Sequence, residues 1–209
     1  MKVWDLATRV YHWLQAAIFC GLLISGFSGN GPHTLLGLAL LSLIIWRVLL
    51  GFWGSDTNRF TQFVVSPIKI IRYLKGQPQT NIGHNPLGAL MVIGLISLLL
   101  LQCISGLALS GFLDSLPNSD IWLTDGVFDW LESTHLLLAN ILPLVVVLHV
   151  AAIIVYKFKR KPLLKAMLTG SQATKSGPMA VKFVSHRRAF LMLVIAGLVT
   201  MTIIAPSMA

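Results

Sequence analysis

The chain has 209 residues, of which 56% are hydrophobic and only 11% are charged. With a mean hydropathy of +0.79, this composition indicates an integral membrane protein and excludes a soluble globular domain. The net charge of +9 does not indicate nucleic-acid binding. The basic residues lie in the short segments that flank apolar runs, where they orient membrane proteins.

Five apolar runs approach the roughly 20 residues that a helix needs to cross a bilayer. The first starts near the N-terminus and ends at Phe27. Trp4, Tyr11 and Trp13 resemble an interfacial aromatic belt, and no clean small-residue cleavage site follows, so we expect a retained span rather than a signal peptide. The other four predicted spans cover residues 34–52, 86–112, 133–156 and 189–205.

The segments between the spans differ in charge. Residues 54–85 are polar and basic, and the stretch IKIIRYLK at 68–75 has the pattern of an amphipathic helix lying on the membrane surface. Residues 113–132 are expected to form a loop, which holds five of the seven acidic residues and no Lys or Arg. By the positive-inside rule, the N-terminus is cytoplasmic, whereas the acidic loop and the C-terminus face outward.

The fourth predicted span carries two histidines, His135 and His149, which are 14 residues apart. At about 100° and 1.5 Å per residue they return to nearly the same helix face, roughly 21 Å apart along the axis. His12 begins the first span on the inner side, and His33 begins the second on the outer side. Depth therefore pairs His12 with His149 and His33 with His135. Ionisable residues inside spans are costly and usually functional, so the two pairs predict axial ligands of two haem irons; the alternative is helix-to-helix hydrogen bonding.

Two further residues are candidates around these sites. Arg47, near the inner surface, is expected either to pair with a haem propionate or to extend toward the interface, as membrane arginines do. His84 directly precedes Asn85-Pro86, which favours a role at the start of a helix. The alternative for His84 is a proton carrier beside an inner quinone pocket. Because the chain lacks a Cys-x-x-Cys-His motif, its haem would not be attached by thioethers.

Several stretches resemble the bacterial cytochrome b561 and nickel-iron hydrogenase cytochrome b subunit family. The two-histidine fourth span matches that family, and the resemblance covers about residues 3 to 160. The other matching stretches are residues 3–13 (VWDLATRVYHW), 47–60 (RVLLGFWGSDTNRF) and 83–90 (GHNPLGAL).

This resemblance implies two b haems within a four-helix core and electron exchange between the membrane quinone pool and a redox partner. His12, His33, His135 and His149 fall on the ligand positions of the family. Relatives often have an acidic residue directly after the first ligand of the fourth span, where this chain has Leu136. The fifth span occurs in only some relatives.

Together these features predict an all-α integral membrane helical bundle. A four-helix haem-binding core would occupy residues 1–160, and a basic cytoplasmic linker with a fifth transmembrane helix would occupy 161–209. We expect a di-haem b-type cytochrome of the bacterial inner membrane, surrounded by lipid, that exchanges electrons between quinone and a periplasmic or membrane-associated partner. A c-type cytochrome or a hydrogenase or dehydrogenase subunit would be such a partner.

The chain would then be an electron-transfer subunit of a respiratory oxidoreductase rather than a stand-alone enzyme. One alternative is a superoxide-oxidising quinone reductase of the same family, but an acidic outward loop disfavours the approach of an anion. The other is a non-redox membrane protein, which an absorption spectrum would separate from the first two.

Overall fold

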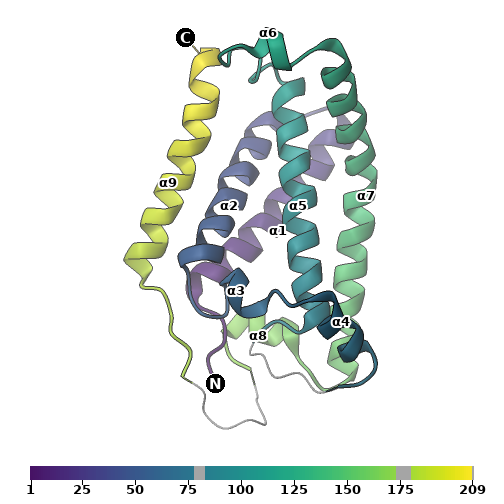
Figure 1. Ribbon diagram of the computed structural model, residues 1–209, viewed down its shortest axis with the longest axis vertical. Helices are drawn as coiled ribbons and strands as arrows, with labels where there is room; N and C mark the ends of the chain where they lie inside the picture. The colour runs from purple at the N-terminus through teal and green to yellow at the C-terminus, as the bar shows by residue number, and fades with distance from the viewer. Residues whose placement is uncertain (78–82, 173–179, 209) are drawn as a thin grey trace.

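The computed structural model describes residues 1–77, 83–172 and 180–208. Every regular element within these residues is helical, and five helices are long and apolar enough to cross a membrane (Figure 1). They are α1 (Leu6–Ser28), α2 (His33–Trp53), α5 (Pro86–Leu109), α7 (Asp125–Phe158) and α9 (His186–Ile204). The predicted all-α membrane bundle is therefore confirmed.

Short helices lie at both ends of the bundle. One end holds the N-terminus, and the opposite end holds the C-terminus (Figure 1). We call them the inner and the outer end, after the predicted topology. The inner end carries α3 (Phe60–Phe63), α4 (Pro67–Leu74) and α8 (Leu163–Thr169), and the outer end carries α6 (Ser119–Trp122) and a final 3-10 turn, η1 (Ala205–Met208).

Local capping residues explain where the spans begin. The Asp5 side chain accepts a hydrogen bond from the Thr8 backbone N–H at 2.7 Å and caps α1. Asn85 caps α5 in the same way, accepting from the Gly88 N–H at 2.8 Å, and Pro86 supplies the φ angle that suits a first helical turn.

The start of α7 differs from the expectation. Its 34 residues begin at Asp125, so Asp125, Asp129 and Glu132 are helical, and the predicted loop over 113–132 is wrong from residue 125 onward. The three acids recur at helical spacing, and Asp125 in the first turn interacts favourably with the helix dipole. Their charge marks the edge of the hydrocarbon, not the end of the helix. At about 1.5 Å per residue, α7 is about 50 Å long and projects well beyond the bilayer core.

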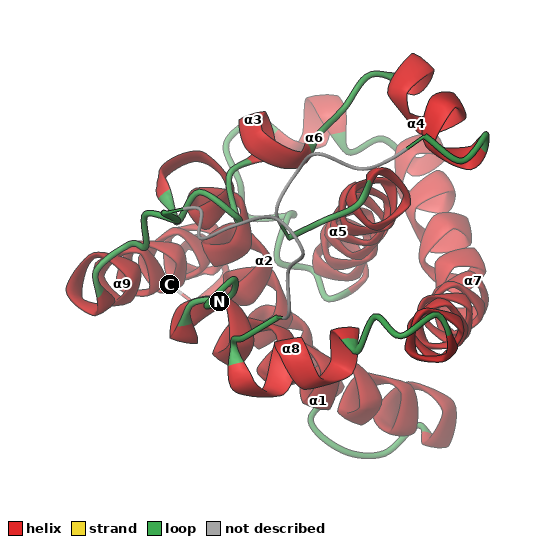
Figure 2. Cartoon of the chain, turned by 90° about the horizontal axis from the view of Figure 1, so that it is seen from below, coloured by secondary structure: helices red, strands yellow, loops and turns green. Residues whose placement is uncertain are grey.

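Four spans form the core. α5 packs against α7, α1 packs against α2, and α2 also contacts α5. Seen from below, α9 lies outside this group beside α2 (Figure 2). The buried side chains that join α2, α5 and α7 include Leu40, Ile44, Leu99, Leu107, Leu138 and Leu142.

The fifth span is held against α2 by small and polar contacts. Ala196 of α9 is fully buried, and small residues of this kind let helices approach closely in lipid. The Ser42 hydroxyl donates to Thr200 Oγ1 at 2.8 Å, and Trp46 Nε1–H donates to the Ala189 carbonyl oxygen at 2.9 Å. These contacts give α9 a packing role beside the core.

The N-terminus and the α2–α3 turn are both tied to the chain beyond α7. The backbone N–H groups of Val3 and Trp4 donate to the Gly170 carbonyl oxygen at 2.8 and 3.1 Å. The Asp56 N–H donates to the Lys182 carbonyl oxygen at 3.0 Å, and the Lys182 N–H donates back to the Asp56 carboxylate at 2.9 Å. The division of the chain at residue 160 stays a prediction, and these bonds cross it.

Candidate functional site

The four histidines form the two pairs that depth predicted. The ring centroids of His12 and His149 lie 6.4 Å apart, with an interplanar angle of 49°. The ring centroids of His33 and His135 also lie 6.4 Å apart, with an angle of 75°. All four side chains are half-buried. α7 therefore contributes one histidine to each pair, while α1 and α2 contribute one each.

This separation suits two imidazoles on opposite sides of one metal ion. A metal–imidazole nitrogen bond is about 2.0 Å long, and with about 1.1 Å from nitrogen to ring centre, the two centroids would lie about 6 Å apart. Within the part of the chain that the structure describes, no three His, Cys, Asp or Glu side chains converge as a metal site. Each pair could thus offer two ligands, which is the number that an iron would need if a macrocycle supplied the remaining four.

A serine orients the imidazole of His33 at the outer pair. The Ser25 hydroxyl donates to the Leu22 carbonyl oxygen at 3.3 Å, which leaves its oxygen free to accept from His33 Nδ1–H at 3.0 Å. In the tautomer with its proton on Nδ1, the Nε2 lone pair would be available to a metal. Metal-binding histidines usually donate their second N–H in this manner.

His135 is oriented by the same device on a different helix. The Ser105 hydroxyl donates to the Leu101 carbonyl oxygen at 2.9 Å, and its oxygen lies 3.1 Å from His135 Nδ1. The Gln102 carbonyl oxygen, 3.2 Å from the same nitrogen, is a second acceptor. Sequence reasoning missed Ser25 and Ser105; the available signal was a hydroxyl inside an otherwise apolar span.

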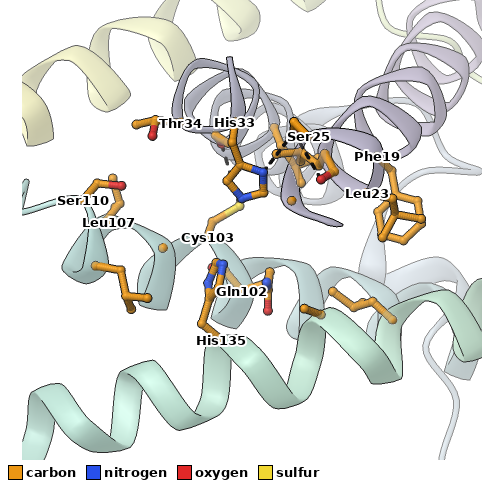
Figure 3. A pocket seen from close by; sticks show the side chains of 18 of the residues that line it. Phe19, Leu23, Ser25, His33, Thr34, Gln102, Cys103, Leu107, Ser110 and His135 are labelled. Atoms are coloured by element: carbon orange, nitrogen blue, oxygen red, sulfur yellow. Dashed lines mark hydrogen bonds between the residues drawn. The ribbon is translucent and has the colours of Figure 1, made fainter. Parts of the chain in front are cut away.

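A cavity of about 510 Å3 contains the outer pair. α1, α2, α5 and α7 all line it, and Figure 3 shows His33 and His135 facing each other across it. Its volume is in the range of small-molecule and cofactor sites. Phe19, Leu38 and Leu107 are among its mostly apolar lining residues, which suits the faces of a porphyrin.

Glycines make room around the outer rings. A Cβ atom at Gly106 would lie 3.1 Å from His135 Cε1, and one at Gly26 would lie 3.2 Å from His33 Cε1, so larger residues would displace the imidazoles. Gly37 lines the cavity and has no such neighbour within 4 Å. Open space beside a glycine of the cavity that holds both histidines fits a flat macrocycle, so the outer residues are compatible with haem.

The inner pair has a different surrounding. His12 Nδ1 and the Gln15 side-chain oxygen are buried without a hydrogen-bond partner in the described residues. The His12 ring meets Trp13 edge-on, with centroids 5.1 Å apart. Buried polar atoms normally have partners, so these two atoms mark a place where a further group or water fits.

Arg47 lies inside the inner end rather than at the interface. Its side chain is only 4% exposed, its Nη1–H donates to the Asn58 carbonyl oxygen at 3.3 Å, and its guanidinium carbon lies 5.3 and 5.8 Å from the ring centroids of Phe60 and Phe63. Arg47 therefore does not extend to the surface, and a contact with a haem propionate stays a prediction.

His84 packs between two aromatic rings. Its centroid lies 4.8 Å from that of Trp4 and 4.6 Å from that of Phe63. Burial, and secondarily the nearby charge of Arg47, lower the pKa of His84 to about 3, although a hydrogen bond to the Thr57 backbone opposes this. A neutral, stacked imidazole just before the Asn85 cap fits the role at the start of a helix that the sequence favoured.

A buried carboxylate organises the same end. Asp5 accepts hydrogen bonds from the Thr8 backbone N–H and hydroxyl, both at 2.7 Å, from the Ser55 hydroxyl and from Asn58 Nδ2 at 3.2 Å. Asn58 also bonds Arg47 through its carbonyl oxygen, so it links the buried negative and positive charges. Asp5, Ser55 and Asn58 belong to stretches that carry the family resemblance, yet their role as a structural network was not predicted.

The outer end carries negative charge. All five acidic residues of this end are exposed, and they lie in the segment from the end of α5 through the first turns of α7. Glu132 is in the same helix as the ligand candidate His135, less than one turn away. The acids are Asp114, Asp120, Asp125, Asp129 and Glu132.

Comparison with known proteins identifies the family. The family model described as prokaryotic cytochrome b561 matches residues 3–170, which include all four core spans and α8. No curated protein and no solved structure matches the chain. The family resemblance in the sequence is thereby confirmed. The chain belongs to the prokaryotic cytochrome b561 family, whose members are membrane-embedded b-type cytochromes that bind haem b and transfer electrons.

Proposed function

We propose that this protein is a di-haem b-type cytochrome that transfers electrons across the bacterial inner membrane, between the quinone pool and a redox partner outside. The observation that carries the proposal is the presence of two histidine pairs with the same 6.4 Å separation. α7 supplies one member of each pair, 14 residues apart, so the two sites would be stacked along the membrane normal.

The residues around each pair define what it does. Haem b held by two imidazoles supplies reversible one-electron chemistry and leaves no open iron position for oxygen. His33 and His135 present Nε2 because Ser25 and Ser105 accept from Nδ1. The mostly apolar lining of the outer cavity favours electron transfer over proton chemistry at that place.

Quinone exchange is proposed at the inner end, near Arg47 and His84. Arg47 is a buried cation without a direct ion pair among the described residues, and it suits an oxygen with partial negative charge. With a pKa of about 3, His84 is neutral near pH 7. It would act there as a hydrogen-bonding group and take up a proton only when a negatively charged neighbour raises its pKa.

The proposed partner docks at the outer end. Asp120, Asp125 and Asp129 are exposed there, and their charge favours a basic surface, such as that of a basic c-type cytochrome or a hydrogenase or dehydrogenase subunit. The protein would then be a subunit of a respiratory chain complex. Superoxide oxidation is disfavoured, because the same acids would repel an approaching anion.

Haem content tests the proposal. The protein is purified after expression with ample haem, and haem is measured by pyridine haemochrome against polypeptide concentration. We expect close to two haems per chain, and close to two for a His84→Gln control, because His84 is not in either pair. A value near one would reject the di-haem assignment, and a value near zero would reject the cytochrome.

A further inference from the structure

The short helix α4 is amphipathic and leaves its apolar side uncovered. Ile68, Ile71 and Leu74 are 61%, 52% and 64% exposed. Seen from below, α4 lies at the rim of the bundle (Figure 2). Large aliphatic side chains exposed at the rim of a membrane protein, on a helix too short to span, indicate contact with the boundary between headgroups and acyl chains.

The same helix carries positive charge, and so does the end of α7. Lys69, Arg72 and Lys75 of the α4 segment are exposed. Among the described residues, Arg59 forms an ion pair with Asp56, whereas Lys69, Arg72 and Lys75 form no ion pair. The cations at the end of α7 are exposed as well; they are Lys157, Lys159, Arg160 and Lys161.

A hydrogen bond joins the two sets into one surface. Tyr73 of α4 and Tyr156 in the last turns of α7 share a hydrogen bond at 3.0 Å between their hydroxyl oxygens. Lys161 Nζ lies 5.9 Å from the ring centroid of Tyr156, within reach of a cation–π contact. We call this surface the α4–α7 corner: Ile68, Ile71 and Leu74, the seven cations named above, and the two tyrosines.

The backbone at the corner places a cation where glycine is usual. Arg160 has φ +58°, in the left-handed region, directly after the end of α7. The Lys161 N–H donates to the Tyr156 carbonyl oxygen at 2.9 Å and closes the turn. Glycine is favoured at this position of a helix end, and strained non-glycine residues cluster at functional sites. A positively charged residue therefore occupies this position at a conformational cost.

We infer that the α4–α7 corner binds the headgroup of an anionic phospholipid from the surrounding leaflet. The cations would contact the phosphate, and the exposed aliphatic side chains of α4 would lie among the acyl chains. A polybasic cluster beside a span together with an amphipathic helix is the arrangement that recognises anionic lipid. Of the acids at this end, Asp5 is buried and Asp56 is paired with Arg59, so the corner has no nearby counter-charge. This inference does not depend on the number of haems or on quinone.

Native mass spectrometry of the detergent-purified, haem-loaded protein tests the inference. Phosphatidylglycerol and phosphatidylcholine of the same chain length are titrated separately, and inorganic phosphate is added in a third arm. We expect phosphatidylglycerol to be retained at least about tenfold better than phosphatidylcholine. Equal retention of both lipids would overturn the inference. Release of bound phosphatidylglycerol by millimolar phosphate would also overturn it, because the corner would then be a phosphate site.

Matched variants locate the site. Arg72→Gln with Lys75→Gln should weaken phosphatidylglycerol retention by about fivefold per cation. Arg187→Gln with Arg188→Gln removes two exposed cations from the first turn of α9, which also lies at the inner end. This double variant should leave retention unchanged. An equal loss in both double variants would mean that net charge alone attracts the lipid, and would reject the corner. Arg72→Lys with Lys75→Arg keeps both charges and should retain phosphatidylglycerol as well as the wild type does. Tyr73→Phe should reduce phosphatidylglycerol retention without changing the visible haem spectrum.

Discussion

The imidazole rings of His12 and His149 lie 6.4 Å apart, although α1 and α7 are the first and last spans of the core. His33 and His135 repeat the same separation at the other end. α7 thus connects the two pairs, and each pair is completed by a different helix. Substituting either histidine of one pair should therefore have the same effect on haem binding.

The first prediction is that haem loss follows the pairs. His12→Ala and His149→Ala should remove one and the same spectral component, because either change leaves one axial ligand. His33→Ala and His135→Ala should remove the other component. Redox titration followed by visible absorption separates the two. If the His33 and His149 variants lost the same component, the proposed pairing would be wrong.

The second prediction concerns the serine that holds His33. Ser25→Ala removes the acceptor of the Nδ1–H at 3.0 Å, which lowers the basicity of the ligand and its preference for ferric iron. We expect a higher midpoint potential for the outer component and about 10- to 100-fold weaker haem retention. Ser105→Ala should have a smaller effect, since the Gln102 carbonyl oxygen remains 3.2 Å from His135 Nδ1. Ser42→Ala, whose hydroxyl contacts α9, is the control and should leave both potentials unchanged.

The third prediction is that Asn58 stabilises the inner end. Asn58→Ala removes one donor to the Asp5 carboxylate at 3.2 Å and one to the Thr8 hydroxyl at 2.6 Å. Losing partners of buried polar groups costs about 1–3 kcal/mol each, so the thermal midpoint in detergent should fall. Thr202→Ala, which removes an exposed hydroxyl on α9, is the matched control. Equal midpoints for the two variants would exclude a structural role for this network.

The fourth prediction is a pH effect from His84. Its pKa falls from 6.5 to about 3 on folding, so the unfolded chain binds more protons between these values. Stability should therefore be greatest above pH 6.5 and decline as the pH falls toward 3. His84→Phe should reduce this decline while keeping the aromatic packing with Trp4 and Phe63. Thermal melts between pH 7 and pH 4 measure the difference, with His186→Gln as the control; identical pH profiles for wild type and His84→Phe would contradict the prediction.

The fifth prediction concerns the acidic outer surface. Changing Asp120, Asp125 and Asp129 to Asn should slow electron transfer with a basic partner at low salt, because steering charge is lost. The wild-type rate should itself fall as salt rises, since the Debye length is only about 8 Å at physiological ionic strength. Stopped-flow rates with a basic c-type cytochrome measure both effects, and Asp56→Asn at the inner end is the control. Rates that respond to neither salt nor the substitutions would limit these acids to a topological role.

Much of this protein could be predicted from its sequence, because its main features depend on local properties. Apolar runs of sufficient length locate the spans, since a bilayer leaves the backbone little choice but a helix. The 14-residue separation of His135 and His149 places both on one face through helix geometry alone. Depth in the membrane then sorts the remaining histidines, because a span has only two ends.

Other features were decided only by the tertiary structure, because they depend on which side chains from distant segments meet. The serines that orient His33 and His135 come from other helices, and no local pattern pairs them. Arg47 is buried because Asn58, Phe60 and Phe63 fold over it, whereas its position in the sequence also allowed a surface location. The start of α7 at Asp125 was missed because charge was taken as the end of the helix. Hydropathy reports the edge of the membrane, but backbone hydrogen bonding continues past it.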